Sequence, residues 1–137
     1  MSDSDQWDQA FAQARPAGKP ADKDTPEPVY ASVEAWVTEW FAPMIRRPTR
    51  SHLVWCPRWW EHGEALARLE ALWRSWEALR LDGTTGMSVW WRDHCDPHLA
   101  FLRDDNQSPF ADCRDGEHRE FDELQVAPAP PGWWGDD

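Results

Sequence analysis

Apolar residues recur every three or four positions in one long stretch of the chain, Trp55 to Leu81. The buried stripe that this spacing predicts consists of Ala65, Leu66, Leu69, Leu72, Trp73, Trp76 and Leu79. Proline is favoured in the first turn of a helix because its missing N–H would have no partner there, so we expect this helix to begin near Pro57. The pair Asp82-Gly83 predicts its end.

A shorter helix is expected earlier in the chain. Ser32 is a good N-cap, because its hydroxyl can accept a hydrogen bond from an amide of the first turn. Apolar residues from Val33 to Met44 then follow helical spacing. Proline does not fit a straight helix interior, so the helix should kink or end just before Pro43.

The third helix is expected to begin at Ser88 and to carry a second tryptophan-rich stretch, Met87 to Leu102. At Pro97 two structures are open: the helix kinks, or Asp96 caps a new segment. Together, the two tryptophan-rich stretches hold seven of the twelve tryptophans.

These elements predict a mainly α fold, a small three-helix domain over residues 30–126 whose irregular end, from Phe110 to Val126, wraps the helices. Residues 1–29 hold four prolines and six acids against three bases. Such a segment has too little apolar surface to offset its ordering entropy, so we predict a disordered acidic, Pro-rich arm. Residues 127–137, APAPPGWWGDD, form a Pro/Trp-rich tail.

The formal net charge is −11, and residues 30–126 are acidic as well. Proteins that bind duplex DNA usually present a basic domain, so duplex DNA is a less favoured partner. A local basic patch is still predicted from Arg46, Arg47, Arg50 and Arg58. No stretch predicts a membrane span or a signal peptide, which favours a cytoplasmic protein whose three cysteines are free or metal-bound.

The strongest candidate for chemistry is a metal site. Cys56 and His62 have the spacing C-x5-H, and Cys113 and His118 have the spacing C-x4-H. Two Cys/His pairs far apart in sequence suit one tetrahedral structural zinc ion, which would anchor the irregular C-terminal part. In the alternative, the four side chains pack and form ordinary hydrogen bonds.

His94 and His98 are alternate ligands, because residues four apart share one helical face. With His62 they would supply the three protein ligands of a catalytic zinc ion. No arrangement of nucleophile, base and oxyanion donors is recognisable, and no catalytic residues are assigned.

Three pairs of adjacent tryptophans remain. Neighbours on a helix cannot both face the core fully, so one member of each helical pair should be at least partly exposed, unless both straddle a wide apolar stripe. Exposed tryptophan is typical of binding hot spots. The candidate partner-binding residues are Trp59, Trp60, Trp91, Trp133 and Trp134.

The string WCPRWWEHGEALARLEALWRSWEALRLD, followed by TGMSVWWRDHCDPHLAFL, PFADC and a later histidine, resembles an uncharacterised family of small proteins from actinobacteria and their phages, plasmids and integrated elements. The resemblance runs from Tyr30 to Trp134. It implies an association with mobile and conjugative elements, and no established activity. The positions that match the family are Cys56, His62, Cys113, His118, Trp55, Trp60 and Trp73. Cys95 departs from the family pattern, which favours Cys56 and Cys113 as ligands.

We therefore expect a non-enzymatic accessory factor of an actinobacterial mobile or conjugative element that binds another protein. The alternative is a zinc-stabilised nucleic-acid-associated factor, which depends on the Cys/His set and the four arginines. A second alternative, a metal-dependent hydrolase, requires an open coordination position on the metal.

Overall fold

The computed structural model describes residues 26–48, 50–114 and 116–135. Within them the chain is mainly helical and contains no strand, as predicted, with one isolated bridge between Leu53 and Asp104. The elements are, in order, α2 (Val33–Trp36), η1 (Val37–Phe41), α3 (Ala42–Met44), η2 (Trp59–Glu61), α4 (Gly63–Leu79), α5 (Gly86–Val89), η3 (Trp90–Cys95) and α6 (Asp96–Arg103). Residues 1–25 of the predicted N-terminal arm lie outside the described residues.

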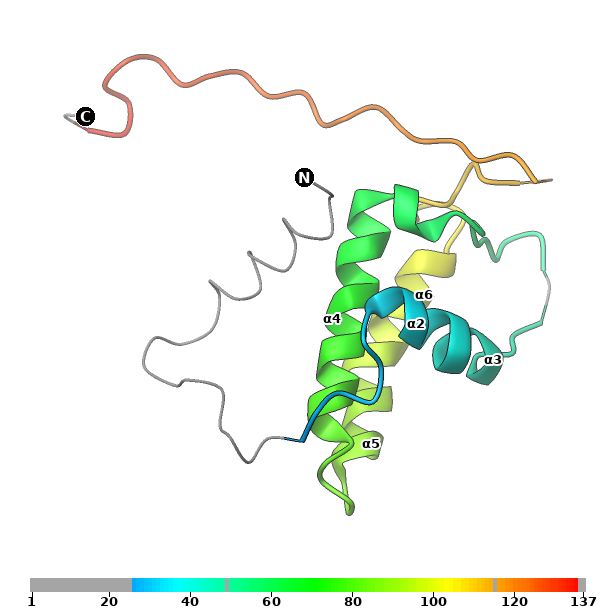
Figure 1. Ribbon diagram of the computed structural model, residues 1–137. Helices are drawn as coiled ribbons and strands as arrows, with labels where there is room; N and C mark the ends of the chain where they lie inside the picture. Colours follow the sequence, from blue (N-terminus) through cyan, green and yellow to red (C-terminus); the bar gives the residue numbers. More distant parts are fainter. Residues whose placement is uncertain (1–25, 49, 115, 136–137) are drawn as a thin grey trace.

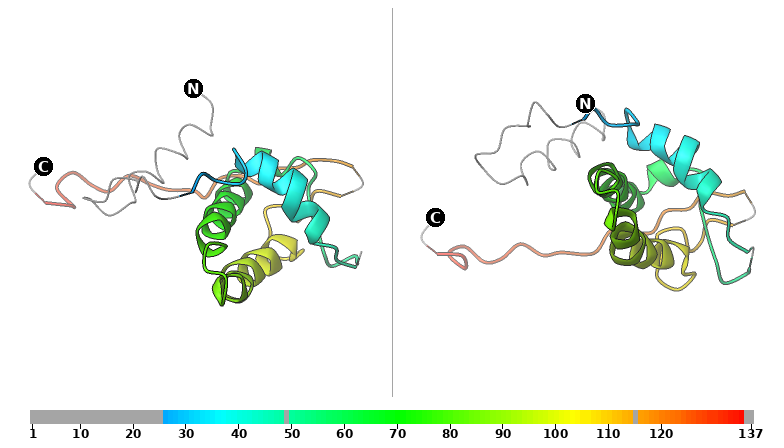
Figure 2. Two further views of the ribbon diagram at one scale, coloured as in Figure 1. Left: turned by 60° about the horizontal axis from the view of Figure 1, so that its bottom comes forward. Right: turned by 90° about the horizontal axis from the view of Figure 1, so that it is seen from below.

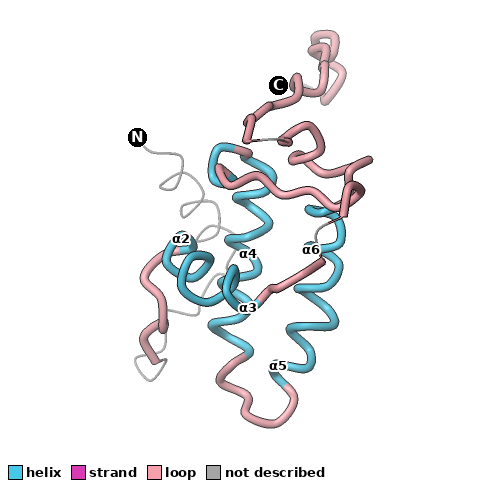
Figure 3. The backbone as a smooth tube through the Cα atoms, turned by 90° about the vertical axis from the view of Figure 1, so that its right-hand side faces the viewer, coloured by secondary structure: helices cyan, strands magenta, loops and turns pink. Residues whose placement is uncertain are grey.

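Within the described residues, the longer helical elements follow one another as three rods, first α2–η1–α3, then α4 and then α5–η3–α6 (Figure 1). Helix α4, the second rod, lies beside the third rod, formed by α5, η3 and α6, and a tight loop joins the two at one end (Figure 3). The rod of α2, η1 and α3 crosses them, as two further views also show (Figure 2). The expected three-helix domain is thus confirmed.

The first rod begins where the sequence predicts. The hydroxyl of Ser32 accepts a hydrogen bond from the backbone N–H of Ala35 at 3.1 Å. The rod widens into a π turn, η1, and ends at Met44, one residue beyond Pro43. A π turn accommodates the missing N–H and the bulk of a following proline without breaking the rod.

The third rod also contains a proline, Pro97, and a π turn precedes it. This rod begins at Gly86 rather than at Ser88, and the π turn η3 ends two residues before Pro97. Asp96 is helical, with φ −57° and ψ −48°, and its N–H bonds to the carbonyl of Trp91. The alternative in which Asp96 caps a new segment is therefore wrong, because the wide turn carries the helix through the proline.

Helix α4 has the predicted buried stripe but a different start. Pro57 lies in a turn, η2 is a short 3-10 helix, and the α-helix begins only at Gly63. The prediction of a start near Pro57 is wrong because His62 is extended, with φ −91° and ψ 110°. This break falls at His62, one of the candidate metal ligands.

Tryptophans form the centre of the core. Trp36 and Trp90 are fully buried and meet edge to face, with ring centroids 6.1 Å apart. The indole N–H of Trp90 donates to the carbonyl of Leu72 at 3.0 Å, which ties the third rod to α4. Burying one tryptophan contributes about 4–6 kcal/mol before ordering entropy is subtracted, so these contacts outweigh every surface ion pair.

A single carboxylate fastens the N-terminal entry to α4. Glu77 accepts hydrogen bonds from the backbone N–H groups of Val29 and Tyr30, at 2.9 and 3.0 Å. It also accepts from the indole of Trp73 and from the guanidinium of Arg80. These donors lower the pKa of Glu77 against the opposing effect of its burial.

After α6 the chain returns toward the start of α4, where Phe110 is fully buried. From Arg119 to Gly135 every residue is exposed. In Figure 1 this last part extends away from the helices as an irregular segment. The predicted wrap is thus buried or half-buried only as far as His118, and the exposed residues 120–124 line a shallow hollow with the start of α4.

Candidate metal centre

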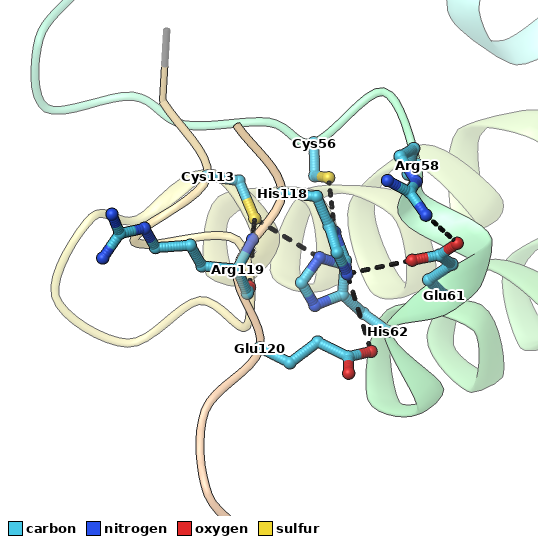
Figure 4. A network of polar contacts seen from close by, with 8 residues as sticks. All are labelled: Cys56, Arg58, Glu61, His62, Cys113, His118, Arg119 and Glu120. Atoms are coloured by element: carbon cyan, nitrogen blue, oxygen red, sulfur yellow. Dashed lines mark hydrogen bonds and ion pairs between the residues drawn. The ribbon is translucent and has the colours of Figure 1, made fainter. Parts of the chain in front are cut away.

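Four buried or nearly buried side chains meet where the returning chain contacts the start of α4 (Figure 4). The sulfur of Cys56 lies 3.3 Å from Nδ1 of His118, and the sulfur of Cys113 lies 3.4 Å from Nε2 of His62. All four ligand atoms lie within 4.8 Å of one another. The structure thus brings together the two Cys/His pairs predicted from the sequence, and this cluster could hold a metal ion.

Each half of the cluster comes from a rigidly placed backbone. Cys56 and His62 lie on either side of η2, whose short helix spaces them. Cys113 follows a turn in which its own N–H bonds to the carbonyl of Phe110 at 2.9 Å. The ring of Phe110 in turn packs edge to face against His62, with centroids 5.0 Å apart. The halves are therefore held together by core packing as well as by the ligands themselves.

The distances fit tetrahedral coordination. With zinc–sulfur bonds of about 2.3 Å and zinc–nitrogen bonds of about 2.0–2.1 Å, the sulfur–nitrogen edge of a tetrahedron is about 3.5 Å. The two measured sulfur–nitrogen distances are 3.3 and 3.4 Å. Both of these edges are therefore close to the length that a bound zinc ion would impose.

Without a cation, the surroundings of the Cys56 sulfur favour the protonated thiol. Burial raises the pKa of the Cys56 thiol, and the nearby sulfur of Cys113 raises it further. The backbone N–H of Arg58 acts in the opposite direction by favouring the thiolate. The sulfur of Cys113 accepts a hydrogen bond from the backbone N–H of Arg119 at 3.4 Å. A bound divalent ion would stabilise both thiolates in this setting.

The two histidines of the cluster have different surroundings. Burial, followed by the proximity of His118, lowers the pKa of His62, which keeps its imidazole neutral. The neutral form is the one that binds a metal. His118 presents Nδ1 to the cluster, and its Nε2 lies 3.1 Å from a carboxylate oxygen of Glu61. That contact meets the distance of an ion pair but not the angle of a hydrogen bond.

Glu61 is itself held in place. Its other oxygen pairs with the guanidinium of Arg58, and a second carboxylate, Glu120, lies 3.7 Å from Nε2 of His118. A carboxylate behind a ligating histidine fixes the orientation of the ring and makes it a stronger ligand. Glu61 was not singled out from the sequence, although its position directly before His62 was a usable signal.

The alternate ligands do not join this site. Neither His94 nor His98 belongs to a group of potential metal ligands among the residues that the structure describes. Nδ1 of His98 lies 2.9 Å from the guanidinium of Arg68. The set of His62, His94 and His98 suggested for a catalytic zinc ion is therefore not assembled, because His62 faces Cys113 instead.

The four arginines of the predicted patch have separate surroundings. Arg58 belongs to the metal centre through Glu61. Arg46 donates from Nε to the carbonyl of Pro43 at 3.2 Å. Arg47 lines a hollow beside α6, and Arg50 is exposed on the connector.

The predicted partner-binding tryptophans divide by exposure. Trp59 is only 7% exposed and belongs to the core, so its inclusion is corrected: the turn at Pro57 points this ring inward. Trp91 is partly buried against Trp90. Trp60 is 51% exposed, and Trp133 and Trp134 are 68% and 82% exposed.

Fold and site together define a small helical domain with a Cys2His2 cluster between its longest helix and its C-terminal chain. The chain belongs to the family described as "Domain of unknown function (DUF4913)", whose profile matches residues 30–132. Neither the curated proteins nor the solved structures contain a significant match. Among the described residues, no helix has the length and apolar character needed to cross a membrane.

Proposed function

We propose that this protein is a non-enzymatic accessory factor in which one structural zinc ion fixes the exit of a protein-binding C-terminal tail. The carrying observation is the position of the Cys/His cluster. It contains the last buried or half-buried side chains of the described chain, and every residue from Arg119 to Gly135 is exposed beyond it. A metal there would hold the exit of the tail while the tail itself stays free to bind.

Zinc is the metal that the ligands favour. Two cysteines with two histidines are a typical ligand set of structural zinc sites, whereas calcium and magnesium prefer oxygen ligands. Four protein ligands also leave no position for a reacting water molecule. This supports a structural role over the metal-dependent hydrolase considered from the sequence.

Protein binding is supported by the composition of the tail. Trp133 and Trp134 follow the prolines of APAPPG, and both rings are largely exposed. Pro-rich segments lose little entropy on binding, and tryptophan supplies much of the energy in many interfaces. We also propose, from the family resemblance, that the factor belongs to an actinobacterial mobile or conjugative element, and that it acts in the cytoplasm.

The test is affinity capture from lysate of a host that carries such an element. The full-length zinc-loaded protein is compared with the variant Trp133→Ala/Trp134→Ala, and Leu81→Ala is the control for an exposed apolar residue outside the tail. A partner retained by the full-length protein and by the control, but lost from the tail variant, supports the proposal. A bound set that is identical for all three proteins would overturn it.

A second candidate, a zinc-stabilised nucleic-acid-associated factor, is favoured by one observation. Residues 45–60 contain four arginines and no acid within a chain of net charge −11. Salt-dependent binding to duplex DNA that weakens in Arg47→Ala would support this candidate. Absence of binding at low salt would dismiss it.

A further inference from the structure

A hollow lies beside α6, between the end of the first rod and the connector. Its smaller part, of about 260 Å³, has an apolar lining that includes Phe41, Ile45, Trp55 and Leu99. Its larger part, of about 660 Å³, shares Leu99 with the smaller part, and two arginines, Arg47 and Arg103, line both. An apolar floor with two guanidinium groups suits a ligand that carries both an aromatic ring and a carboxylate.

The two arginines are not neutralised by the acids around them. Arg47 makes no hydrogen bond or ion pair within the described part of the chain, and Arg103 donates only to the carbonyl of Pro48, at 3.4 Å. Of the three aspartates that line the larger part, Asp104 binds the loop that follows it and Asp105 lies 3.5 Å from Arg114. The third, Asp96, is exposed.

The C-terminal segment, residues 119–137, has the complementary character. It contains five acids and one arginine, and the cations that it would meet in the hollow are Arg47 and Arg103. Its apolar side chains are uncovered: Leu124 is 92% and Val126 is 90% exposed, as are most of the two terminal tryptophans. The tryptophans lie in a turn closed by a hydrogen bond from the N–H of Trp133 to the carbonyl of Pro130.

We propose that the hollow between Arg47 and Arg103 receives the C-terminal segment of a second copy of this chain. A tryptophan of the partner would lie on the apolar floor, and its acids would face the arginines. This inference rests on the proposed function in treating the tail as a binding segment, and it names the partner. An exchange of identical segments makes a closed symmetric dimer.

The reach of the segment favours a second copy. From Arg119 to Trp133 an extended chain spans up to about 50 Å. In Figure 1 the segment passes beyond the end of α4 where η2 lies and continues away from the helices. A segment held at its root by the metal centre and directed outward is suited to reach a neighbouring molecule.

The experiment is sedimentation velocity on the full-length zinc-loaded protein over a wide concentration range. We expect a dimer whose dissociation constant rises at least about tenfold in Arg47→Glu and in Trp133→Ala/Trp134→Ala. Arg92→Glu, which reverses an arginine paired only with Asp93, is the matched charge control and should dimerise normally. Arg47→Glu keeps an intact tail, and the tryptophan variant keeps an intact hollow. A mixture of the two variants should therefore form a heterodimer in which one tail occupies one hollow.

A protein that stays monomeric at all concentrations, or a dimer indifferent to Arg47→Glu, would overturn the inference. A monomer in which Arg47→Glu makes the tail tryptophans more accessible to an aqueous fluorescence quencher would also overturn the inference. That result would mean that the tail docks in the hollow of its own chain. An effect of Arg47→Glu on DNA binding alone would assign the arginines to nucleic acid. A monomer that captures another protein through its tail would contradict this inference and would still support the proposed function.

Discussion

The carboxylate behind His118 allows a sharp test of the metal centre. Glu61→Gln keeps the shape of the side chain and removes the charge that faces Nε2 of His118 at 3.1 Å. Loss of such a supporting group typically weakens metal binding about 10–100-fold. Glu61 is 26% exposed and Glu120 offers a second carboxylate at 3.7 Å. We therefore expect the lower end of this range, about tenfold or about 1.4 kcal/mol.

The assay is competition for zinc against a chromophoric chelator at fixed pH. Glu64→Gln is the matched control, because this glutamate lies three residues further on, is 52% exposed and pairs with Arg68 instead. The control should bind zinc as the unmodified protein does. Equal affinities for Glu61→Gln and the unmodified protein would refute the role assigned to Glu61, and equal losses in both variants would reduce it to an effect of net charge.

Three further predictions concern the scaffold. Glu77→Gln should lower the free energy of unfolding by about 1.5–3 kcal/mol at neutral pH. Because the folded pKa of Glu77 is lowered, its stabilisation is present above the ordinary glutamate range and is lost as the pH falls through the folded pKa, so urea titrations of variant and parent should converge in acid. Trp90→Phe should cost about 1–3 kcal/mol in the same assay, since it removes the indole's hydrogen bonds to the carbonyl of Leu72 and the hydroxyl of Ser75 and leaves part of a fully buried site unfilled; a change below 0.5 kcal/mol, roughly the level of an ordinary surface substitution, would contradict this. Gly86→Ala places a Cβ 1.9 Å from the carbonyl oxygen of Leu79 and should lower the melting temperature strongly, whereas Gly83→Ala, with nothing within 4 Å, should leave it unchanged; equal effects would show that the loop simply yields.

The helices were largely predictable because their apolar spacing records burial directly. The stripe from Ala65 to Trp76 and the cap at Ser32 are both present. What the sequence could not show is how the chain passes its prolines. A π turn and a kink place the same residues inside, so periodicity does not distinguish them.

The metal ligands were predictable for a different reason. Cysteine and histidine pairs are rare enough that their spacing alone suggested the cluster that the structure assembles. Their supporting carboxylate was harder to find, because glutamate is common in this acidic chain and only the fold identifies which one faces His118. The orientation of Trp59 was predicted wrongly, since its inward position depends on the turn at Pro57, which interrupts the regular helix.

The proposed structural zinc site is tested most directly by the metal content of the purified full-length protein, measured together with thermal melting in the presence and absence of chelator. We predict one zinc ion per chain, and none in Cys113→Ser. A ligand present at a thousand times its dissociation constant stabilises by about 4 kcal/mol, so chelator should lower the melting temperature by roughly 15–30 °C. A protein that carries no metal after growth with added zinc, and that melts identically with and without chelator, would contradict the structural zinc site.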